Sequence, residues 1–198
     1  MAIVAEGQHG RVYLTPNSEM EEVALRASPK WKPDVALPVN PRDFKTPNYG
    51  LMTFADLFTP RQLVALATFS DLIQEAREMA EEDARSAGLS LGSPLRAGGS
   101  GAIAYAEAVA VYLAFCVDKM TDTNTSLCSW QVDPPRLRAT FGRQALPMVW
   151  DYAEANIFGD AAGDFGRCVG SLTEVLDRGG LAGKGSAQQA DAQAFSVN

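Results

Sequence analysis

The chain has 198 residues, a mass of 21.2 kDa and a formal net charge of −7 at neutral pH. This length suits a single domain with its own core, and 46% hydrophobic with 21% charged residues excludes an entirely disordered chain. The acidic balance also argues against a protein that binds nucleic acid through its overall charge, because that mode requires concentrated lysine and arginine.

A β-hairpin and a proline-rich connector are predicted at the start of the chain. Two β-prone runs flank Gly7-Gln8-His9-Gly10, which places the single histidine in an exposed turn. A short helix is expected in SEMEEVALRA, residues 18–27. The connector that follows is kept extended by its prolines, at Pro29, Pro33, Pro38, Pro41 and Pro47. We therefore assign residues 1–48 to this hairpin and a connector that lies along a surface.

The strongest local signal predicts a long helix over residues 59–87. Thr59 is suited to cap the first turn, Pro60 is tolerated at the first helical position, and Gln62 completes a T-x-x-Q capping box. Gly88 is placed to end the helix. Apolar residues recur with helical spacing at Leu63, Leu66, Phe69, Ile73, Ala76 and Ala80.

A second long helix is predicted over residues 102–121, after a flexible loop with the sequence SLGSPLRAGGSG. It is apolar on most faces, which favours a central position antiparallel to the first helix. Its apolar run is shorter than the ~20 residues of a membrane span and contains Glu107. The preceding GGSGAIA partly matches a nucleotide-binding glycine loop, but no strand comes before it, so we expect a plain loop with Ser100 as the helix cap.

Three shorter helices are predicted in the remainder, in DPPRLRATFGRQ, in LPMVWDYAEAN behind Pro147, and over residues 165–178. The predicted fold class is therefore mainly α. Residues 49–178 form a helical domain on the two long helices, and residues 179–198 are a linker rich in glycine, alanine and glutamine.

The sequence supports no catalytic, cofactor-binding or metal-binding residue. A single histidine excludes a Ser/His/Asp arrangement, and Cys116, Cys128 and Cys168 are too far apart to indicate zinc or a disulfide framework. We expect buried or semi-buried thiols in a reducing compartment. The first residues lack a basic segment followed by a long apolar one, so we expect a cytoplasmic location and no membrane partner.

Aromatic and basic residues alternate in one region, where Trp130, Phe141, Trp150 and Tyr152 surround three arginines. If residues 133–144 are helical, Arg136 and Arg143 share one face and Arg138 points elsewhere. That face is a possible DNA contact. The alternative places the aromatic rings in the core and pairs the arginines at its rim with acidic residues such as Glu78 or Glu82.

Three ordered blocks of sequence resemble a known family. They are YGLMTFADLFTPRQLVALATFSDL, AYAEAVAVYLAFCVDKMTDTNTSLCSW and FGRQALPMVWDYAEAN. Together they resemble the central region of the large bacterial adenine-specific DNA methylases that contain a zinc ribbon, with similarity over residues 2–191. Residues 59–62 match the capping segment of that family. Asn124, Ser126, Leu127, Cys128 and Trp130 match its N-S-S-L-C-R-W pattern, with Ser129 in place of the arginine.

The resemblance implies that the chain is a fragment of a longer AdoMet-dependent DNA amino-methyltransferase. In that family an AdoMet-binding segment and the zinc ribbon precede this region and the D-P-P-Y motif follows it. AdoMet and zinc would therefore belong to the full-length parent, and Asp133-Pro134-Pro135 lacks the aromatic residue of that motif because Arg136 follows. We expect a helical insertion that orients DNA or braces the catalytic sheet, inactive alone, with the rest of the parent as its partner.

Arg136, Arg143, Trp130 and Asn124 are the candidate DNA contacts in that setting. The alternative function is a non-enzymatic module that binds a partner protein in a restriction or phage-defence complex.

Overall fold

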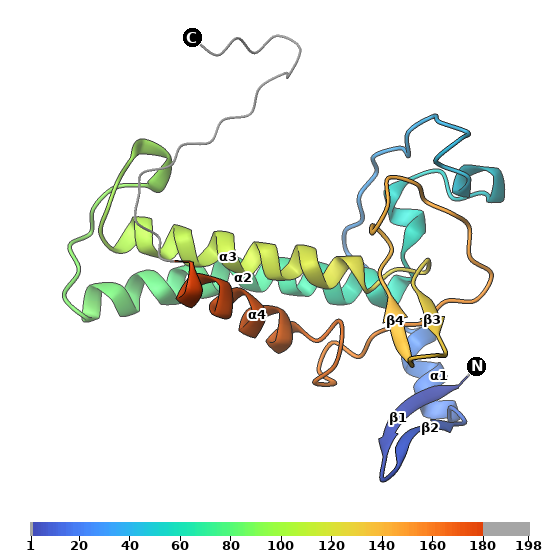
Figure 1. The fold of residues 1–198 in the computed structure, drawn as a ribbon. Coiled ribbons are helices and arrows are strands. Elements are labelled where there is room, and N and C mark those ends of the chain that lie inside the picture. The colour runs from blue at the N-terminus through green and yellow to red at the C-terminus, as the bar shows by residue number, and fades with distance from the viewer. Residues whose placement is uncertain (1, 180–198) are drawn as a thin grey trace.

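The computed structural model describes residues 2–179 (Figure 1). It is mainly helical, as predicted, and the β-strands of the described chain form two short antiparallel hairpins. Residues 180–198, most of the predicted linker, lie outside the described residues. The elements are β1 (Ile3–Gly7), β2 (Gly10–Leu14), α1 (Ser18–Leu25), α2 (Pro60–Ser86), α3 (Ala102–Asp122), β3 (Ser129–Gln131), β4 (Arg136–Arg138) and α4 (Phe165–Arg178).

The N-terminal hairpin has the predicted position and turn. β1 pairs with β2 in antiparallel register from Ile3 opposite Leu14 to Gly7 opposite Gly10. Gln8 and an exposed His9 form the turn. The hairpin leads into α1, whose first turn is capped by the side chain of Asn17.

The predicted capping box at the start of α2 is confirmed. The backbone N–H of Thr59 donates to Gln62 Oε1 at 2.8 Å, and the N–H of Gln62 donates to Thr59 Oγ1 at 3.4 Å. The helix ends at Ser86, two residues after its last buried residue, Ala84. Gly88 then adopts a left-handed backbone with φ of +92°, which favours glycine at the position that ends a helix.

Helices α2 and α3 lie antiparallel along each other, and α4 packs against α3 (Figure 1). The core between α3 and α4 contains Cys116, Met120 and Cys168, all buried. Phe69 of α2 closes this core against Phe165 of α4, with ring centroids 4.5 Å apart. The three helices are therefore joined by one set of apolar contacts.

A second core joins the connector to the start of the helical body. Its buried residues are Leu37, Leu57, Leu127 and Leu146, from four separate segments. The connector also forms isolated β-bridges, from Ala36 to Thr53 and from Phe44 to Leu146. The expectation that the proline-rich connector lies along a surface is met by these contacts, and residues on both sides of position 48 share this core.

The predicted helices in DPPRLRATFGRQ and LPMVWDYAEAN are wrong. The first segment forms the turn of the β3–β4 hairpin and β4 itself, and the second is extended. Backbone groups in the second segment bond to distant chain: the N–H of Leu146 donates to the Asp43 carbonyl and that of Ala153 to the Cys128 carbonyl, both at 2.8 Å. These non-local bonds replace the local bonds that a helix would need.

The predicted Ser100 cap is also wrong. Gly101 occupies the cap position of α3, and no side chain caps that helix. Instead, the N–H of Ala102 donates to the Ser90 carbonyl at 2.8 Å and that of Ile103 to the Leu91 carbonyl at 3.1 Å. Two of the amides that a phosphate would need at this helix start are therefore already bonded within the chain.

Candidate functional site

The β3–β4 hairpin carries two of the three arginines in the predicted basic region. In its register, Gln131 lies opposite Arg136, and Trp130 opposite Leu137. Arg136 and Arg138 therefore share one face of the hairpin, since alternate residues of a strand point the same way. Both Nε atoms donate to Gln131 Oε1, at 2.9 and 3.1 Å. The prediction that Arg138 points away from Arg136 is wrong because the segment is a strand.

Trp130 lies on the opposite face of the hairpin from these arginines. Its ring packs under the guanidinium of Arg11 in β2, whose Cζ lies 5.7 Å from the ring centroid. This cation–π contact joins the two hairpins, although their sequences are far apart. The indole Nε1 is buried and has no hydrogen-bond partner among the described residues. Sequence reasoning missed Arg11, because no motif or spacing connects it with Trp130 before the chain is folded.

The four candidate DNA contacts do not form one surface. Arg143 is exposed in the irregular segment after β4. Asn124 is only 3% exposed, and its Nδ2 donates to the Met120 carbonyl at the end of α3. The alternative pairing with Glu78 or Glu82 is not observed, because within residues 2–179 neither Arg136 nor Arg143 has a carboxylate within 4.0 Å. The hairpin face is thus locally cationic on an acidic chain.

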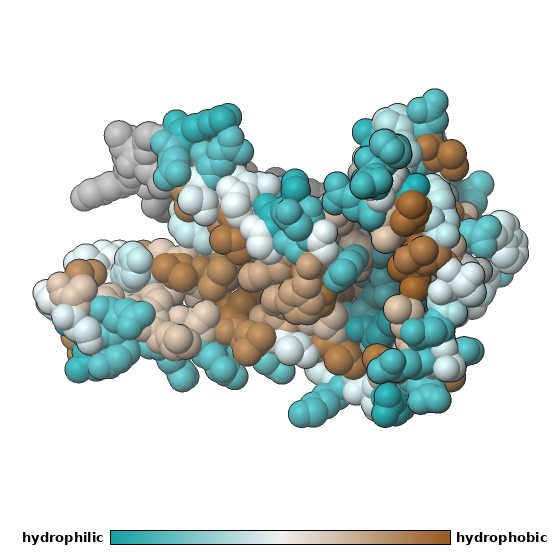
Figure 2. Space-filling view, turned by 90° about the horizontal axis from the view of Figure 1, so that it is seen from below, coloured by the Kyte–Doolittle hydropathy of each residue, from teal (hydrophilic) through white to brown (hydrophobic). Residues whose placement is uncertain are grey.

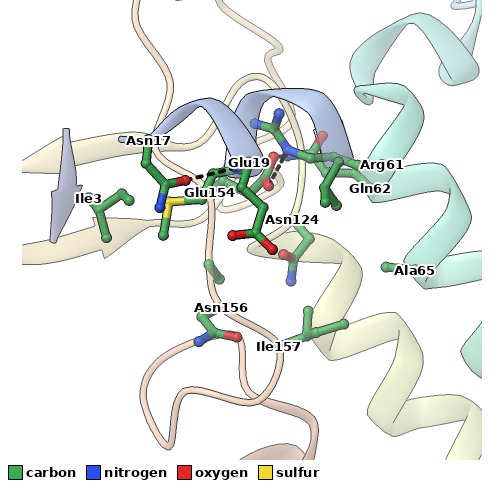
Figure 3. A pocket seen from close by; sticks show the side chains of 13 residues that line it. Ile3, Asn17, Glu19, Arg61, Gln62, Ala65, Asn124, Glu154, Asn156 and Ile157 are labelled. Carbon is green, nitrogen blue, oxygen red and sulfur yellow. Dashed lines mark hydrogen bonds and ion pairs between the residues drawn. The ribbon is translucent and has the colours of Figure 1, made fainter. Parts of the chain in front are cut away.

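A cleft of about 790 Å³ opens between the N-terminal elements and the start of α2 (Figure 3). One side is formed by β1 and α1, and the other by α2 and residues 154–157. Its lining combines apolar and polar side chains: Ile3, Asn17, Glu19, Met20, Val23, Arg61, Gln62, Ala65, Asn124, Glu154, Ala155, Asn156 and Ile157. The volume lies within the range of small-molecule sites in proteins.

One wall of the cleft is fixed by a network around Glu154. Arg61 Nε donates to Glu154 Oε1 at 2.6 Å, and Gln62 Nε2 donates to Glu154 Oε2 at 2.9 Å. The hydrogen bond to Glu154 is the largest cause that raises the pKa of Arg61. Both carboxylate oxygens are occupied and the pair is neutral overall. The network ties α2 to the extended segment.

The floor of the cleft is formed by Asn124, supported from behind by a tight turn. Gly163 in that turn is buried with φ of +89°, and a Cβ at this position would lie 2.3 Å from the Ala155 Cβ and 2.9 Å from Thr123 Oγ1. Only glycine therefore allows the turn to pack this closely.

The three cysteines are free and buried, as expected from the sequence. Burial raises the pKa of the Cys116 and Cys168 thiols, which keeps both in the unreactive protonated form. Cys128 instead lies 3.2 Å from Thr140 Oγ1, which in turn lies 2.6 Å from Thr125 Oγ1. These contacts describe structural thiols.

Within residues 2–179, no group of three or more histidine, cysteine, aspartate or glutamate side chains is arranged to hold a metal ion. None of the helices in that part of the chain combines the length and apolar character needed to cross a bilayer.

Comparison of the chain with protein-family models, with curated proteins and with solved structures gave no match. The resemblance to the zinc-ribbon DNA methylases therefore stays a prediction, and so do the AdoMet and zinc that it implies for a parent protein.

Proposed function

We propose that this chain is a non-catalytic helical scaffold that packs against further polypeptide. The observation that carries the proposal is a second apolar face on α3. A helix that is apolar on all sides is normally covered on all sides. One side of α3 is covered by α2 and α4, but Tyr105, Val111 and Phe115 are 53%, 48% and 53% exposed.

These three side chains lie on one side of the helix. At about 100° per residue, Val111 and Phe115 are 40° apart, and Tyr105 lies 80° beyond Phe115, with Ala108 and Tyr112 between them. The buried residues Ala102, Ala106, Cys116 and Met120 lie on the neighbouring side, and Ala104, close to the start of the helix, is also buried although it falls between Val111 and Phe115 in angle. Apolar side chains are also exposed elsewhere on the helical body, on the side seen from below (Figure 2). Contiguous exposed apolar surface of this kind is typical of interaction sites.

The sequence resemblance suggests what the additional polypeptide is. We propose that it is the rest of an AdoMet-dependent, adenine-specific DNA methylase, with the chain inserted between the cofactor and catalytic segments. In that setting the chain would bind neither AdoMet nor zinc by itself. Three free cysteines support a reducing location, and we propose the cytoplasm.

A DNA-orienting role is a second part of this proposal, and it rests on the β3–β4 hairpin. Arg136 and Arg138 lie side by side and share only a neutral acceptor, Gln131 Oε1, so their charges are available to phosphate. The proposed DNA contact is therefore the hairpin face with Arg136 and Arg138, in place of the helical face with Arg136 and Arg143.

Cysteine labelling tests the scaffold role. A Val111→Cys variant should react rapidly with a maleimide in the isolated chain, because that position is half exposed and the native thiols are buried. In a protein expressed from the full reading frame around the chain, the same cysteine should be protected. Glu78→Cys, on the solvent side of α2, is the matched control for general accessibility.

Equal labelling of Val111→Cys in both proteins would reject the scaffold role. The sequence encoded on either side of the chain also distinguishes the methylase scaffold from the independent interaction module. AdoMet-binding and D-P-P-Y segments there favour the methylase. A natural start and stop without them favour the module that binds a separate partner.

A further inference from the structure

The cleft at the start of α2 contains hydrogen-bond acceptors that no described donor occupies. Asn124 is fixed by its Nδ2, which donates 2.9 Å to the Met120 carbonyl. Because a carbonyl only accepts, this bond identifies the nitrogen, and the Oδ1 atom of the same amide takes no part in it. No described group donates to that oxygen, although the residue is 97% buried and lines the cleft.

Glu19 brings a carboxylate into the same space. It projects from the first turn of α1 into the cleft, towards Asn124 and Asn156 (Figure 3). No lysine or arginine of the described chain lies within 4.0 Å of it. The other carboxylate of the cleft, Glu154, is already neutralised by Arg61 at 2.6 Å. The uncompensated charge in the cleft is therefore one negative charge.

The rest of the lining is suited to an apolar body. Met20 and Val23 of α1, which are 50% and 58% exposed, line the cleft together with Ala65 of α2 and Ile157. Polar amide groups also remain: Asn156 Oδ1 accepts from the Phe158 N–H at 3.0 Å, which leaves its Nδ2 free to donate. The cleft thus offers two acceptors, a donor and apolar walls within about 790 Å³.

We propose that this cleft binds a small organic cation. An ammonium group would donate to the Glu19 carboxylate and to Asn124 Oδ1, and its apolar body would lie against Met20, Val23 and Ile157. An anion is disfavoured, because the guanidinium of Arg61 already has a carboxylate partner. This site uses neither the α3 face nor the β3–β4 hairpin, so a negative result for the site would leave the scaffold role untouched, and the reverse also holds.

Phenethylamine and 2-phenylethanol are a suitable pair of probes, since they share a ring and chain length and differ in the ammonium group. Titration of the ¹⁵N-labelled chain at neutral pH should give saturable amide shifts with phenethylamine at Ala65, Asn124 and Ile157. The alcohol should bind about two- to fivefold more weakly, since it cannot form an ion pair with the exposed Glu19 carboxylate. Saturation with equal affinity for both probes would overturn the proposal, as would shifts confined to the outer face of α3.

Glu19→Gln is the decisive variant. The residue is exposed, so its replacement should leave the fold intact, and phenethylamine affinity should fall about two- to fivefold, as expected for an exposed ion pair. Glu21→Gln is the matched control, because it removes the same charge from the first turn of α1 but does not line the cleft. Affinity that is unchanged in Glu19→Gln, or reduced equally in both variants, would show that the Glu19 carboxylate does not hold the amine.

Discussion

Leu57→Ala should cost about 3–5 kcal/mol of unfolding free energy. Leu57 is completely buried among Leu37, Leu127 and Leu146. Removing three carbon groups at about 0.8 kcal/mol each accounts for roughly 2.4 kcal/mol, and the remaining cavity adds to this loss. The cavity cannot collapse easily, because the Leu57 carbonyl accepts from both the N–H and the Oγ of Ser126, at 2.8 and 2.9 Å.

Urea unfolding followed by two signals measures this loss. All three tryptophans, Trp31, Trp130 and Trp150, lie outside the long helices, so their fluorescence reports on the connector, the β3–β4 hairpin and the irregular segment after it. Far-UV circular dichroism reports mainly on α2, α3 and α4. Leu57 directly precedes α2 and packs on the connector, so both signals should shift to lower urea by the same amount.

Leu72→Ala is the control, since this leucine is 45% exposed on α2 and its loss should cost less than about 1 kcal/mol. A comparably small effect of Leu57→Ala would refute the proposed core. A shift in fluorescence alone would show that the N-terminal part unfolds independently of the helices.

Three further perturbations follow from the geometry. Gly163→Ala should lower the unfolding free energy by about 2–4 kcal/mol in the same assay, because a Cβ would meet Ala155 and Thr123 at a left-handed backbone position; an unchanged urea midpoint would contradict the packing behind Asn124. Asp164 caps α4, and the backbone N–H of Arg167 and then that of Asp160 lower the pKa of its carboxyl. The stability that it contributes is therefore present above its unfolded pKa of about 3.9 and lost as the pH falls through the lower folded value, so the urea midpoints of wild type and Asp164→Ala should differ at pH 6 and converge in strong acid. In the full-length parent, Arg136→Ala with Arg138→Ala should reduce the slope of log DNA affinity against log salt by about 0.9 for each lost phosphate contact, whereas Arg85→Ala on α2 should not; equal slopes would leave the hairpin arginines without a DNA role.

The helices could be predicted where the residues that specify them, such as caps and regularly spaced apolar residues, lie within the helical segment itself. The capping box of Thr59 and Gln62 fixed the start of α2, and the apolar spacing carried it to within a residue of its observed end. The prediction for α4 matches its observed bounds, because the apolar and polar residues of this segment separate onto two faces of a helix. For α3 the apolar run was sufficient even though its expected Ser100 cap was wrong.

The β3–β4 hairpin was not predictable from local signals. Arg136-Leu137-Arg138 is too short to show a clear strand period, and Pro134 and Pro135 fit a helix entry as well as a hairpin turn. Its strand state depends on pairing with residues 129–131, which no single segment reveals. The error also changed the predicted DNA-contact site. Helical spacing put Arg136 on one face with Arg143, whereas the observed strand puts it on one face with Arg138.

The cleft was missed because its walls come from distant parts of the chain. Gln62 was recognised for its role in the capping box, and its Oε1 does serve there. Its Nε2 has a second partner, Glu154, on an extended segment for which a helix was expected. Likewise, no sequence pattern distinguishes Arg61 or Glu154 from other charged surface residues. Such coupling appears only when the fold brings position 154 against the start of α2.

The size of the uncovered α3 face bears on which kind of partner covers it. Complete burial of a large apolar side chain contributes about 1.5–3 kcal/mol, so covering the exposed halves of Tyr105, Val111 and Phe115 contributes roughly 2–4.5 kcal/mol. A free partner held by this face alone would bind at about millimolar strength, even before the cost of association is subtracted. A segment of the same polypeptide already has an effective concentration of about that order, so the same contacts suffice to dock it. The face is therefore better suited to packing within a longer chain than to capturing a separate protein, which favours the scaffold role over the independent interaction module.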